Sequence, residues 1–239
     1  MIYAIGIGPG SFETMTYEAV KAIENSEVIV GYKTYINLIV DMIKDKEVIS
    51  NGMMQEIDRV KKAVEISKTG KTVAVISSGD AGVYGMAGLV LELAEGEEVK
   101  IISGVTASTA AAAVLGAPLM HDFCHISLSD LMTPLDLIYK RVELAAECDF
   151  VICLYNPRSN GRPDYLKKSI ELMKKHKQGT TPVGIVRNVS RNNQEVNICT
   201  LDTIDYEIVD MLSIVIVGNK SSYIDNNKII TRRGYENKR

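Results

Sequence analysis

The chain opens with a strand-like apolar run, Ile2 to Ile5, that leads directly into the glycine-rich residues 6–10. A strand so apolar is typical of a parallel sheet that is covered on both faces. Such sheets bind their ligands beyond the carboxyl ends of the strands. The sequence therefore predicts an α/β fold whose first loop, with Gly8, Pro9 and Gly10, lies at a binding site.

A dinucleotide-binding fold also begins with a strand and a glycine-rich loop, in which backbone N–H groups bind a pyrophosphate. Pro9 argues against that interpretation, because it has no N–H and weakens the loop as an anion site. The second expected strand, residues 27–30, ends in Gly31 and Tyr32, where a ribose-binding acidic residue would be expected. A tight turn without a ligand remains an alternative for this loop on its own.

Composition and charge disfavour several classes of protein. The 239 residues allow one large or two smaller domains, and 46% hydrophobic with 24% charged residues is typical of a globular chain. A net charge of −3 without a long basic run disfavours nucleic acid as a partner. No apolar stretch approaches the roughly 20 residues that span a bilayer, and no basic segment precedes the first strand. We expect a cytoplasmic protein that binds no membrane.

The four cysteines include no C-x-x-C pair, so we expect buried free thiols and no metal site. Along the chain, β-like runs alternate with helical patterns, which favours α/β architecture. Residues 116–118, Gly-Ala-Pro, interrupt the first series and predict two domains, residues 1–115 and 118–239. In the second, the short polar connection at residues 188–194 predicts an antiparallel pair and hence a mixed sheet.

Two more expected strands end in loops of small residues. The strand at residues 72–76 leads into the glycine-rich residues 77–87, and the strand at 99–102 leads into residues 105–113, which are mostly Ala, Ser and Thr. A globular helix normally presents bulky apolar residues to the core. Close helix packing and space for a large flat ligand explain this composition equally well.

Several motifs, in this order, resemble those of the tetrapyrrole methylases, which use S-adenosylmethionine. They are residues 6–10, Ser78-Gly79-Asp80, residues 105–108, Leu154-Tyr155-Asn156-Pro157 and residues 216–219. The resemblance covers almost the whole chain. Within the family, Ala81 after the Gly-Asp pair and the stretches 118–123 and 126–134 look most like the branch that methylates C17 of precorrin-3B or cobalt-factor III in cobalamin biosynthesis, with ring contraction.

The resemblance implies two α/β domains with the active site in a cleft between them, and usually a homodimer. The donor is a sulfonium without a pyrophosphate, so the first loop need not bind an anion and is expected to line the macrocycle trough. The residues that the resemblance places at the donor are Gly79, Asp80, Val83, Tyr84, Thr106, Ala107, Ser108, Leu154, Tyr155, Asn156 and Asn188. For Asp80, a turn residue that bonds its own backbone is the alternative.

The implied substrate is a small-molecule tetrapyrrole rich in carboxylates, which require cationic partners. The expected substrate contacts are Gly8, Pro9, Gly10, Ser129, Arg158 and Arg162. Methyl transfer from a sulfonium depends mainly on alignment and exclusion of water. Ring contraction adds acid–base steps, for which His121 is the candidate, together with Asp80. A packed or surface histidine is the alternative for His121.

Three other functions remain open. The chain could be a sister methylase with a different acceptor, such as one for another precorrin position, a diphthine synthase or a ribosomal RNA methylase. It could be a noncatalytic tetrapyrrole carrier or a nicotinamide oxidoreductase, although the missing acidic residue after residues 27–30 disfavours the last. Early-cobalt and late-cobalt pathways both use relatives of the C17 branch, so the sequence leaves open whether the substrate contains cobalt.

Overall fold

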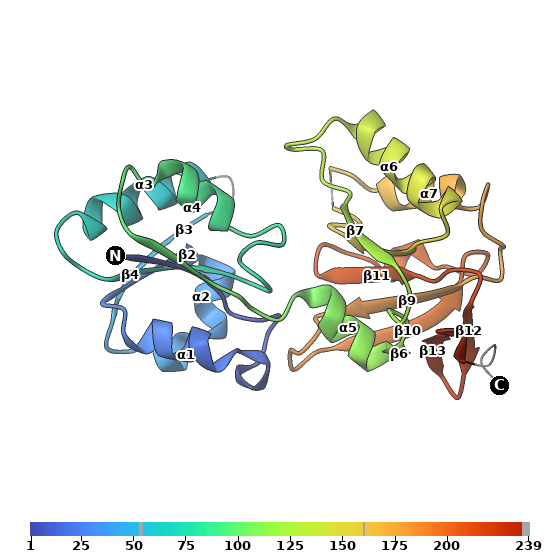
Figure 1. The fold of residues 1–239 in the computed structure, drawn as a ribbon, viewed down its shortest axis with the longest axis horizontal. Helices are drawn as coiled ribbons and strands as arrows, with labels where there is room; N and C mark the ends of the chain where they lie inside the picture. Colours follow the sequence, from blue (N-terminus) through green and yellow to red (C-terminus); the bar gives the residue numbers. More distant parts are fainter. Residues whose placement is uncertain (53–54, 160, 236–239) are drawn as a thin grey trace. The chain divides into compact units, whose positions relative to one another are not determined.

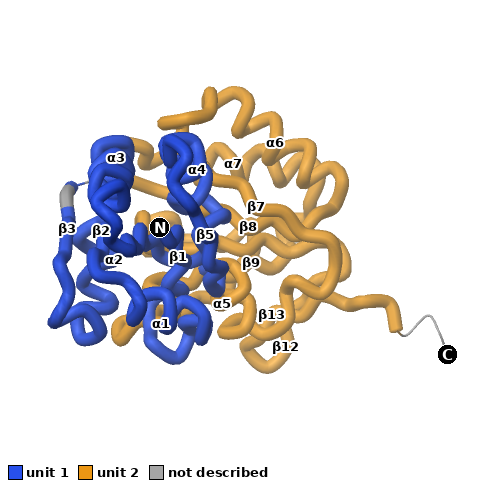
Figure 2. Tube along the Cα trace, turned by 60° about the vertical axis from the view of Figure 1, so that its left-hand side comes forward, with its two compact units in different colours: residues 1–107 blue, residues 108–239 orange. Residues whose placement is uncertain are grey.

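The computed structural model describes residues 1–52, 55–159 and 161–235. The chain divides into two compact units, residues 1–107 (unit 1) and 108–239 (unit 2), which Figure 2 shows in different colours. Each unit contains a five-stranded sheet with helices, which confirms the α/β fold.

The sequence placed a boundary at residues 116–118, whereas the compact units divide at the start of α5 (Ala107–Leu115). Leu115 of this helix packs against Gly184 of unit 2. The division of roles between two domains stays a prediction.

The sheet of unit 1 is parallel throughout, as expected from its apolar strands. Its order is β3-β2-β4-β1-β5, and every paired strand runs in the same direction. The opening strand lies between β4 and β5, so its carboxyl end shares an edge with theirs. The strands are β1 (Ile2–Gly6), β2 (Val28–Tyr32), β3 (Glu47–Asn51), β4 (Val73–Ser77) and β5 (Val99–Ile102).

Helices cover both faces of this sheet, as Figure 1 shows. On one face, Val60 of α3 and Val90 of α4 pack with Ile2 and Val30. On the other, helices α1 and α2 pack with alternate strand residues such as Ile29, because successive side chains of a strand point to opposite faces. The helical elements are η1 (Phe12–Thr14), α1 (Tyr17–Glu24), α2 (Lys33–Leu38), η2 (Val40–Met42), α3 (Glu56–Ser67) and α4 (Ala87–Leu93).

The sheet of unit 2 is mixed, which confirms the prediction. Its order is β10-β9-β11-β8-β7; β7 and β8 are parallel, whereas the other neighbours are antiparallel. The two parallel strands therefore end at the same edge. The strands are β7 (Phe123–Ser127), β8 (Val151–Tyr155), β9 (Pro182–Arg187), β10 (Glu195–Thr200) and β11 (Ser213–Val217).

Different elements cover the two faces of this second sheet. Helices α6 (Leu135–Glu147) and α7 (Tyr165–Met173) pack against Ile152 and Leu154 of β8. On the opposite face, Leu115 of α5 and Ile229 of β13 lie against Gly184. A small sheet there joins β12 (Ser222–Asp225), β13 (Lys228–Thr231) and β6 (Gly116–Ala117). A short helix, η3 (Tyr206–Ile208), follows β10.

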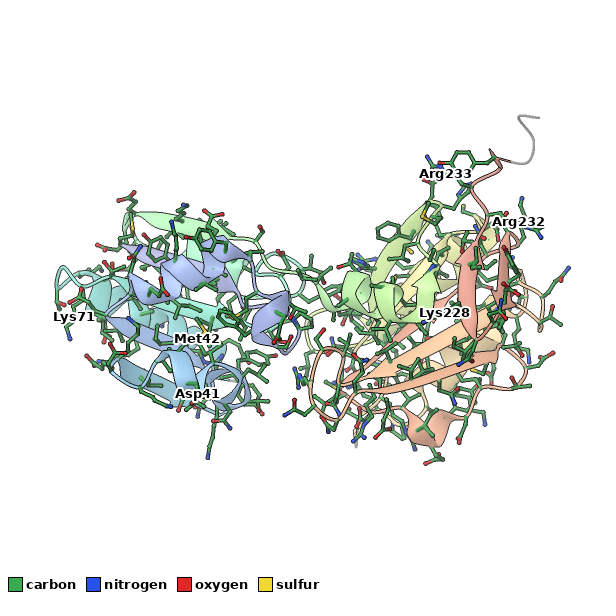
Figure 3. All side chains as sticks on the ribbon, turned by 90° about the horizontal axis from the view of Figure 1, so that it is seen from below. Asp41, Met42, Lys71, Lys228, Arg232 and Arg233 are labelled. Atoms are coloured by element: carbon green, nitrogen blue, oxygen red, sulfur yellow. The ribbon has the colours of Figure 1, made fainter. Side chains whose placement is uncertain are left out.

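The end of α5 is tied to the last strand of the chain. The ammonium group of Lys228, labelled with Arg232 and Arg233 in Figure 3, donates to the carbonyl oxygen of Val114 at 2.9 Å. A cation at a helix C-terminus satisfies an otherwise unpaired carbonyl and complements the helix dipole. Thr231 Oγ1 donates to the carbonyl of Pro118 at 2.7 Å. These bonds fix the C-terminal end of α5 within unit 2.

All four cysteines are free thiols, as predicted. Burial raises the pKa of Cys153 to about 12 and the pKa values of Cys124 and Cys199 to about 11. The prediction of burial is confirmed for Cys153, whereas Cys124 and Cys199 are half-buried, and it was wrong for Cys148, which follows the last turn of α6 and is exposed. Within the described residues, no helix is long and apolar enough to cross a bilayer.

Candidate functional site

The two glycine-rich loops of unit 1 bond directly to each other. Gly8 N–H donates to the Gly79 carbonyl at 3.0 Å, and Gly79 N–H donates to the Gly8 carbonyl at 2.8 Å. Both residues have positive φ, 74° and 71°, a conformation that glycine adopts without strain. A Cβ on Gly6 would lie 2.7 Å from the nitrogen of Ala81. The loops after β1 and β4 therefore meet backbone against backbone, and Pro9 is buried in the first.

The loop after β5 joins the same cluster. A side chain on Gly104 would clash with the carbonyl oxygens of Gly6 and Gly79. Gly104 N–H donates to Asp80 Oδ2 at 2.8 Å. The carboxyl ends of β1, β4 and β5 thus form one backbone-packed surface at the edge where parallel sheets bind ligands.

The carboxylate of Asp80 connects the loops after β4 and β5 by hydrogen bonds. Its Oδ1 accepts the N–H groups of Gly82 and Val83 at 2.8 and 3.1 Å, while Oδ2 accepts that of Gly104. The first two bonds are those of a turn residue, and the third connects two loops. Both carboxylate oxygens are thus engaged as acceptors by the backbone. Donor binding and catalysis by Asp80 stay predictions.

The neighbouring predicted donor contacts present small groups and one aromatic ring. Tyr84 is 54% exposed and has a φ of 56°, so the loop carries its ring outward in a conformation rare for a non-glycine residue. Thr106 and Ala107 are half-buried. Gly79 would have room for a Cβ, whose nearest neighbour would be Ala107 N at 3.8 Å, so its positive φ is the reason for glycine. Gly10 is half-buried.

In unit 2, Ser108 is fully buried at the start of α5. Its backbone N–H donates to the phenol oxygen of Tyr155 at 3.1 Å, and its Oγ lies 2.8 Å from His125 Nε2. The Tyr155 ring meets the His125 ring edge-on, with centroids 5.3 Å apart. Leu154 is buried in the core beside α6 and α7. The structure thus brings Ser108 and Tyr155 together and places the Leu154 side chain on the other face of the sheet.

Asparagines occupy left-handed conformations after two strands of unit 2. Asn156 and Asn188 each have a φ of 52°. Asn156 Nδ2 donates to Ser127 Oγ at 2.9 Å, and this hydroxyl also accepts Ser129 N–H at 3.2 Å. The Asn188 N–H donates to the carbonyl of Leu212 at 3.0 Å. These bonds fix the loop ends in which the predicted contacts Asn156, Asn188 and Ser129 lie.

His125 was missed by sequence reasoning, which singled out His121. The side chain of His121 is 47% exposed, 3.8 Å from the carboxylate of Asp122, and its Nδ1 accepts the N–H of that same neighbour at 2.9 Å. An acid–base role for His121 stays a prediction. Burial lowers the pKa of His125 and favours its neutral form. The only sequence signal was its place in an alternating strand.

The two arginines predicted to bind substrate already have partners in unit 2. Arg158 Nη1 donates to the Tyr206 carbonyl at 2.6 Å, and Nη2 donates to both carboxylate oxygens of Glu207 at 3.0 and 2.9 Å. Arg162 Nη1 lies 3.7 Å from Asp130 Oδ1 and is buried without a hydrogen bond to the described residues. Only Arg162 therefore has an evident unused donor, which fits an added carboxylate.

Within the described part of the chain, His, Cys, Asp and Glu side chains form no group of three or more that could hold a metal ion.

Residues 1–205 match the family model of tetrapyrrole (corrin/porphyrin) methylases. The chain belongs to this family. The resemblance carried by the sequence motifs is thereby confirmed, and members of the family use S-adenosylmethionine.

Three methyltransferases are similar to this chain in sequence. The probable cobalt-factor III C(17)-methyltransferase of Salmonella typhimurium is 54% identical, over 98% of this chain and 99% of that one. The cobalt-factor III methyltransferase of Priestia megaterium is 46% identical over 99% of this chain, which spans 45% of that longer protein. The precorrin-3B C(17)-methyltransferase of a Sinorhizobium species is 36% identical, over 93% of this chain and 90% of that one.

Solved structures share the fold over nearly the whole chain. The methyltransferase CobJ is 33% identical with a TM-score of 0.91, and the match covers 97% of this chain and 99% of that one. A uroporphyrin-III C-methyltransferase from Thermus thermophilus, complexed with S-adenosylhomocysteine, is 19% identical with a TM-score of 0.71 over 91% of each chain. At that identity the second match shows the fold alone.

Proposed function

We propose that this chain is an S-adenosylmethionine-dependent methyltransferase that methylates C17 of cobalt-factor III or precorrin-3B, with ring contraction, in cobalamin biosynthesis. The observation that carries the proposal is 54% identity, over 98% of this chain and 99% of the relative, to a probable cobalt-factor III C(17)-methyltransferase. The match extends along both chains almost completely.

The loops of unit 1 fit a methyl donor better than a dinucleotide. The donor is a sulfonium cation without a pyrophosphate, so it requires no array of N–H donors, and Pro9 is compatible with it. Backbone contact between the loops leaves only small groups at Gly79 and Ala107, beside the exposed ring of Tyr84. These residues, with Val83 and Thr106, would hold the donor in unit 1; Tyr155, Asn156 and Asn188 would contribute from unit 2.

Methyl transfer from a sulfonium depends more on alignment of donor and acceptor than on activation of either by a side chain. When bound, S-adenosylmethionine supplies the methyl group: the new C–C bond forms at C17 as the S–C bond breaks, and its electron pair remains on sulfur. The loops held by Asp80 restrict the geometry of binding and exclude water, which is the main protein contribution to such a displacement. Acid–base steps of ring contraction would use His121, an exposed histidine beside Asp122.

Substrate recognition would involve the carboxylates of the macrocycle. Arg162 has an Nη1 that makes no hydrogen bond to the described residues; because this atom is buried 3.7 Å from Asp130 Oδ1, a substrate carboxylate would reach it only if the side chains that cover it moved. Arg158 would first have to exchange Glu207 for the substrate. The proposal also includes a cytoplasmic location and a homodimer. Sedimentation analysis of the purified protein tests the homodimer.

The decisive experiment mixes the purified protein anaerobically with cobalt-factor III and methyl-labelled S-adenosylmethionine. We expect one labelled methyl group on the macrocycle and the absorption spectrum of a contracted ring. A parallel reaction with precorrin-3B shows whether cobalt is required. Binding of the donor without label transfer to either macrocycle would exclude the C17 assignment and direct the search to other acceptors. Binding of macrocycle without donor would indicate a carrier.

A further inference from the structure

His125 faces α5 from the middle of β7. Residues of β7 alternate between the two faces of the sheet, and Ile126 belongs to the core on the side of α6 and α7. His125 is therefore on the opposite face, where Leu115 of α5 also packs. Its ring contacts Phe123 and Tyr155, with centroid distances of 5.7 and 5.3 Å. The imidazole is held in one orientation by aromatic neighbours on its own strand and on β8.

This imidazole and the neighbouring phenol together hold the start of α5. N–H groups in the first turn of a helix have no partner within the helix. The phenol oxygen of Tyr155 accepts the N–H of Ser108 at 3.1 Å, and Ser108 Oγ bonds to His125 Nε2 at 2.8 Å. Ser108 is fully buried, so replacing either partner leaves a polar group without water to compensate.

The segment that precedes Ser108 is held at its other end as well. Gly104 is bonded to Asp80 in unit 1, and Ser108 is bonded to β7 and β8 in unit 2. Thr106 and Ala107, which lie between these two anchors along the chain, are where the proposed function places part of the donor. Since Lys228 holds the last turn of α5, the helix cannot absorb a change at its first turn by shifting freely.

We propose that His125 is a positioning residue for the methyl donor. By holding Ser108 Oγ, its imidazole fixes the first turn of α5 and, through the chain, the Thr106–Ala107 segment against which the donor binds. The inference rests on the proposed function, because it assigns a role at the same site. It does not require His125 to contact the donor, the macrocycle or the reacting atoms.

The test compares His125→Phe with His125→Gln. Phenylalanine keeps a ring beside Phe123 and Tyr155 but removes the nitrogen that meets Ser108. Glutamine provides an amide that can reach the hydroxyl. The control is His176→Gln, which makes a similar change to a histidine 3.8 Å from Glu143 on the outer side of α6. Calorimetry gives the dissociation constant of S-adenosylmethionine, and steady-state rates give separate KM values for donor and macrocycle.

We expect His125→Phe to raise the donor dissociation constant and donor KM roughly 3- to 10-fold, the effect of losing one hydrogen bond of ordinary strength. The macrocycle KM should change less than about twofold, because the proposal assigns the Thr106–Ala107 segment to the donor and not to the macrocycle. His125→Gln should restore most of the donor affinity, and His176→Gln should leave it unchanged. Ser108→Ala should weaken donor binding similarly, without adding to His125→Phe in the double variant, since both remove the same bond.

An unchanged donor dissociation constant in His125→Phe would overturn the inference, as would equal increases in both KM values or additive effects in the double variant. If His125→Phe does not fold, Ser108→Ala decides the matter, because it removes only the hydroxyl from the same bond. Failure of the proposed function has a different signature, which appears in the wild-type protein: it does not bind the donor, or it binds the donor without transferring the label.

Discussion

In unit 1 the loops at the carboxyl edge of the sheet are held together mainly by backbone groups, whereas in unit 2 side chains add to the backbone bond that joins the ends of β7 and β8. Gly8 and Gly79 exchange two backbone hydrogen bonds, and the carboxylate of Asp80 bonds to backbone N–H groups. In unit 2, Asn156 bonds to the Ser127 hydroxyl and Ser108 bonds to an imidazole and a phenol.

The difference determines which substitutions each region tolerates. At Gly6 and Gly104, backbone packing places carbonyl oxygens where a Cβ would have to lie, so these two positions of unit 1 should reject even alanine. A side-chain network loses one bond at a time and accepts conservative replacements. The largest effects are therefore expected in unit 1 and the smallest at exposed pairs in unit 2.

Gly104→Ala should have the largest effect. Its Cβ would clash with the carbonyl oxygens of Gly6 and Gly79, and moving three loops apart should lower the free energy of unfolding by about 3 kcal/mol and abolish methyl transfer. Urea denaturation and the labelled-methyl assay measure both. Gly88→Ala is the matched control, because a Cβ there meets no atom within 4 Å; it should be neutral or stabilising by up to about 1 kcal/mol. Equal stability of the two variants would contradict the backbone-packing interpretation.

Asp80→Ala should follow, with a loss of about 2 kcal/mol, since a carboxylate that accepts three backbone N–H groups is removed. Asp80→Asn keeps one oxygen for Gly82 and Val83 but presents an NH₂ group to the Gly104 N–H. It should therefore lose about 1 kcal/mol and bind donor more weakly, while kcat at saturating donor falls less than about tenfold. A kcat that vanishes in Asp80→Asn at unchanged stability would instead assign Asp80 to catalysis.

The sequence predicts the fold well because its strands have simple signatures. The opening run, apolar at every position, is a central parallel strand, and the short polar connection at residues 188–194 correctly predicts an antiparallel pair. The glycine-rich loops are also recognisable, since close backbone approach requires glycine. The border of the compact units at the start of α5 was not foreseen, because a helix shows its apolar residues but not the sheet against which they pack.

The side-chain partners at the site were much harder to predict. Asp80 and Gly104 are 24 residues apart, and the sequence of neither loop indicates that these two residues bond to each other. In the sequence, His125 resembles any polar residue of an alternating strand, whereas the position of His121 in a loop suggests an acid–base role. Arg158 was expected to bind substrate, yet its partner Glu207 lies 49 residues further along the chain. Such pairings depend on strand order, which a single sequence does not contain.

In unit 2 the side-chain network should respond to pH. Burial lowers the folded-state pKa of His125 below 6.5, its value in the unfolded chain. As the pH falls through 6.5 the unfolded state binds more protons than the folded state, so the free energy of unfolding decreases. The stability associated with neutral His125 is therefore complete above 6.5 and is lost as the pH falls toward the lowered pKa. The difference in stability between wild type and His125→Gln should thus shrink from about pH 7.5 to about pH 5.5; a constant difference in urea denaturation would contradict the shift.

Glu207→Gln should have the smallest effect. The side chain of Glu207 is 80% exposed, and an exposed ion pair contributes at most about 1 kcal/mol, while Arg158 keeps its bond to the Tyr206 carbonyl. The variant nevertheless sharpens the comparison, because it releases Arg158 without removing it. If Arg158 binds a substrate carboxylate, the macrocycle KM should fall in Glu207→Gln and rise in Arg158→Gln. If the arginine only fastens its loop to η3, Glu207→Gln should leave that KM unchanged, and unit 2 would recognise the substrate through Arg162 instead.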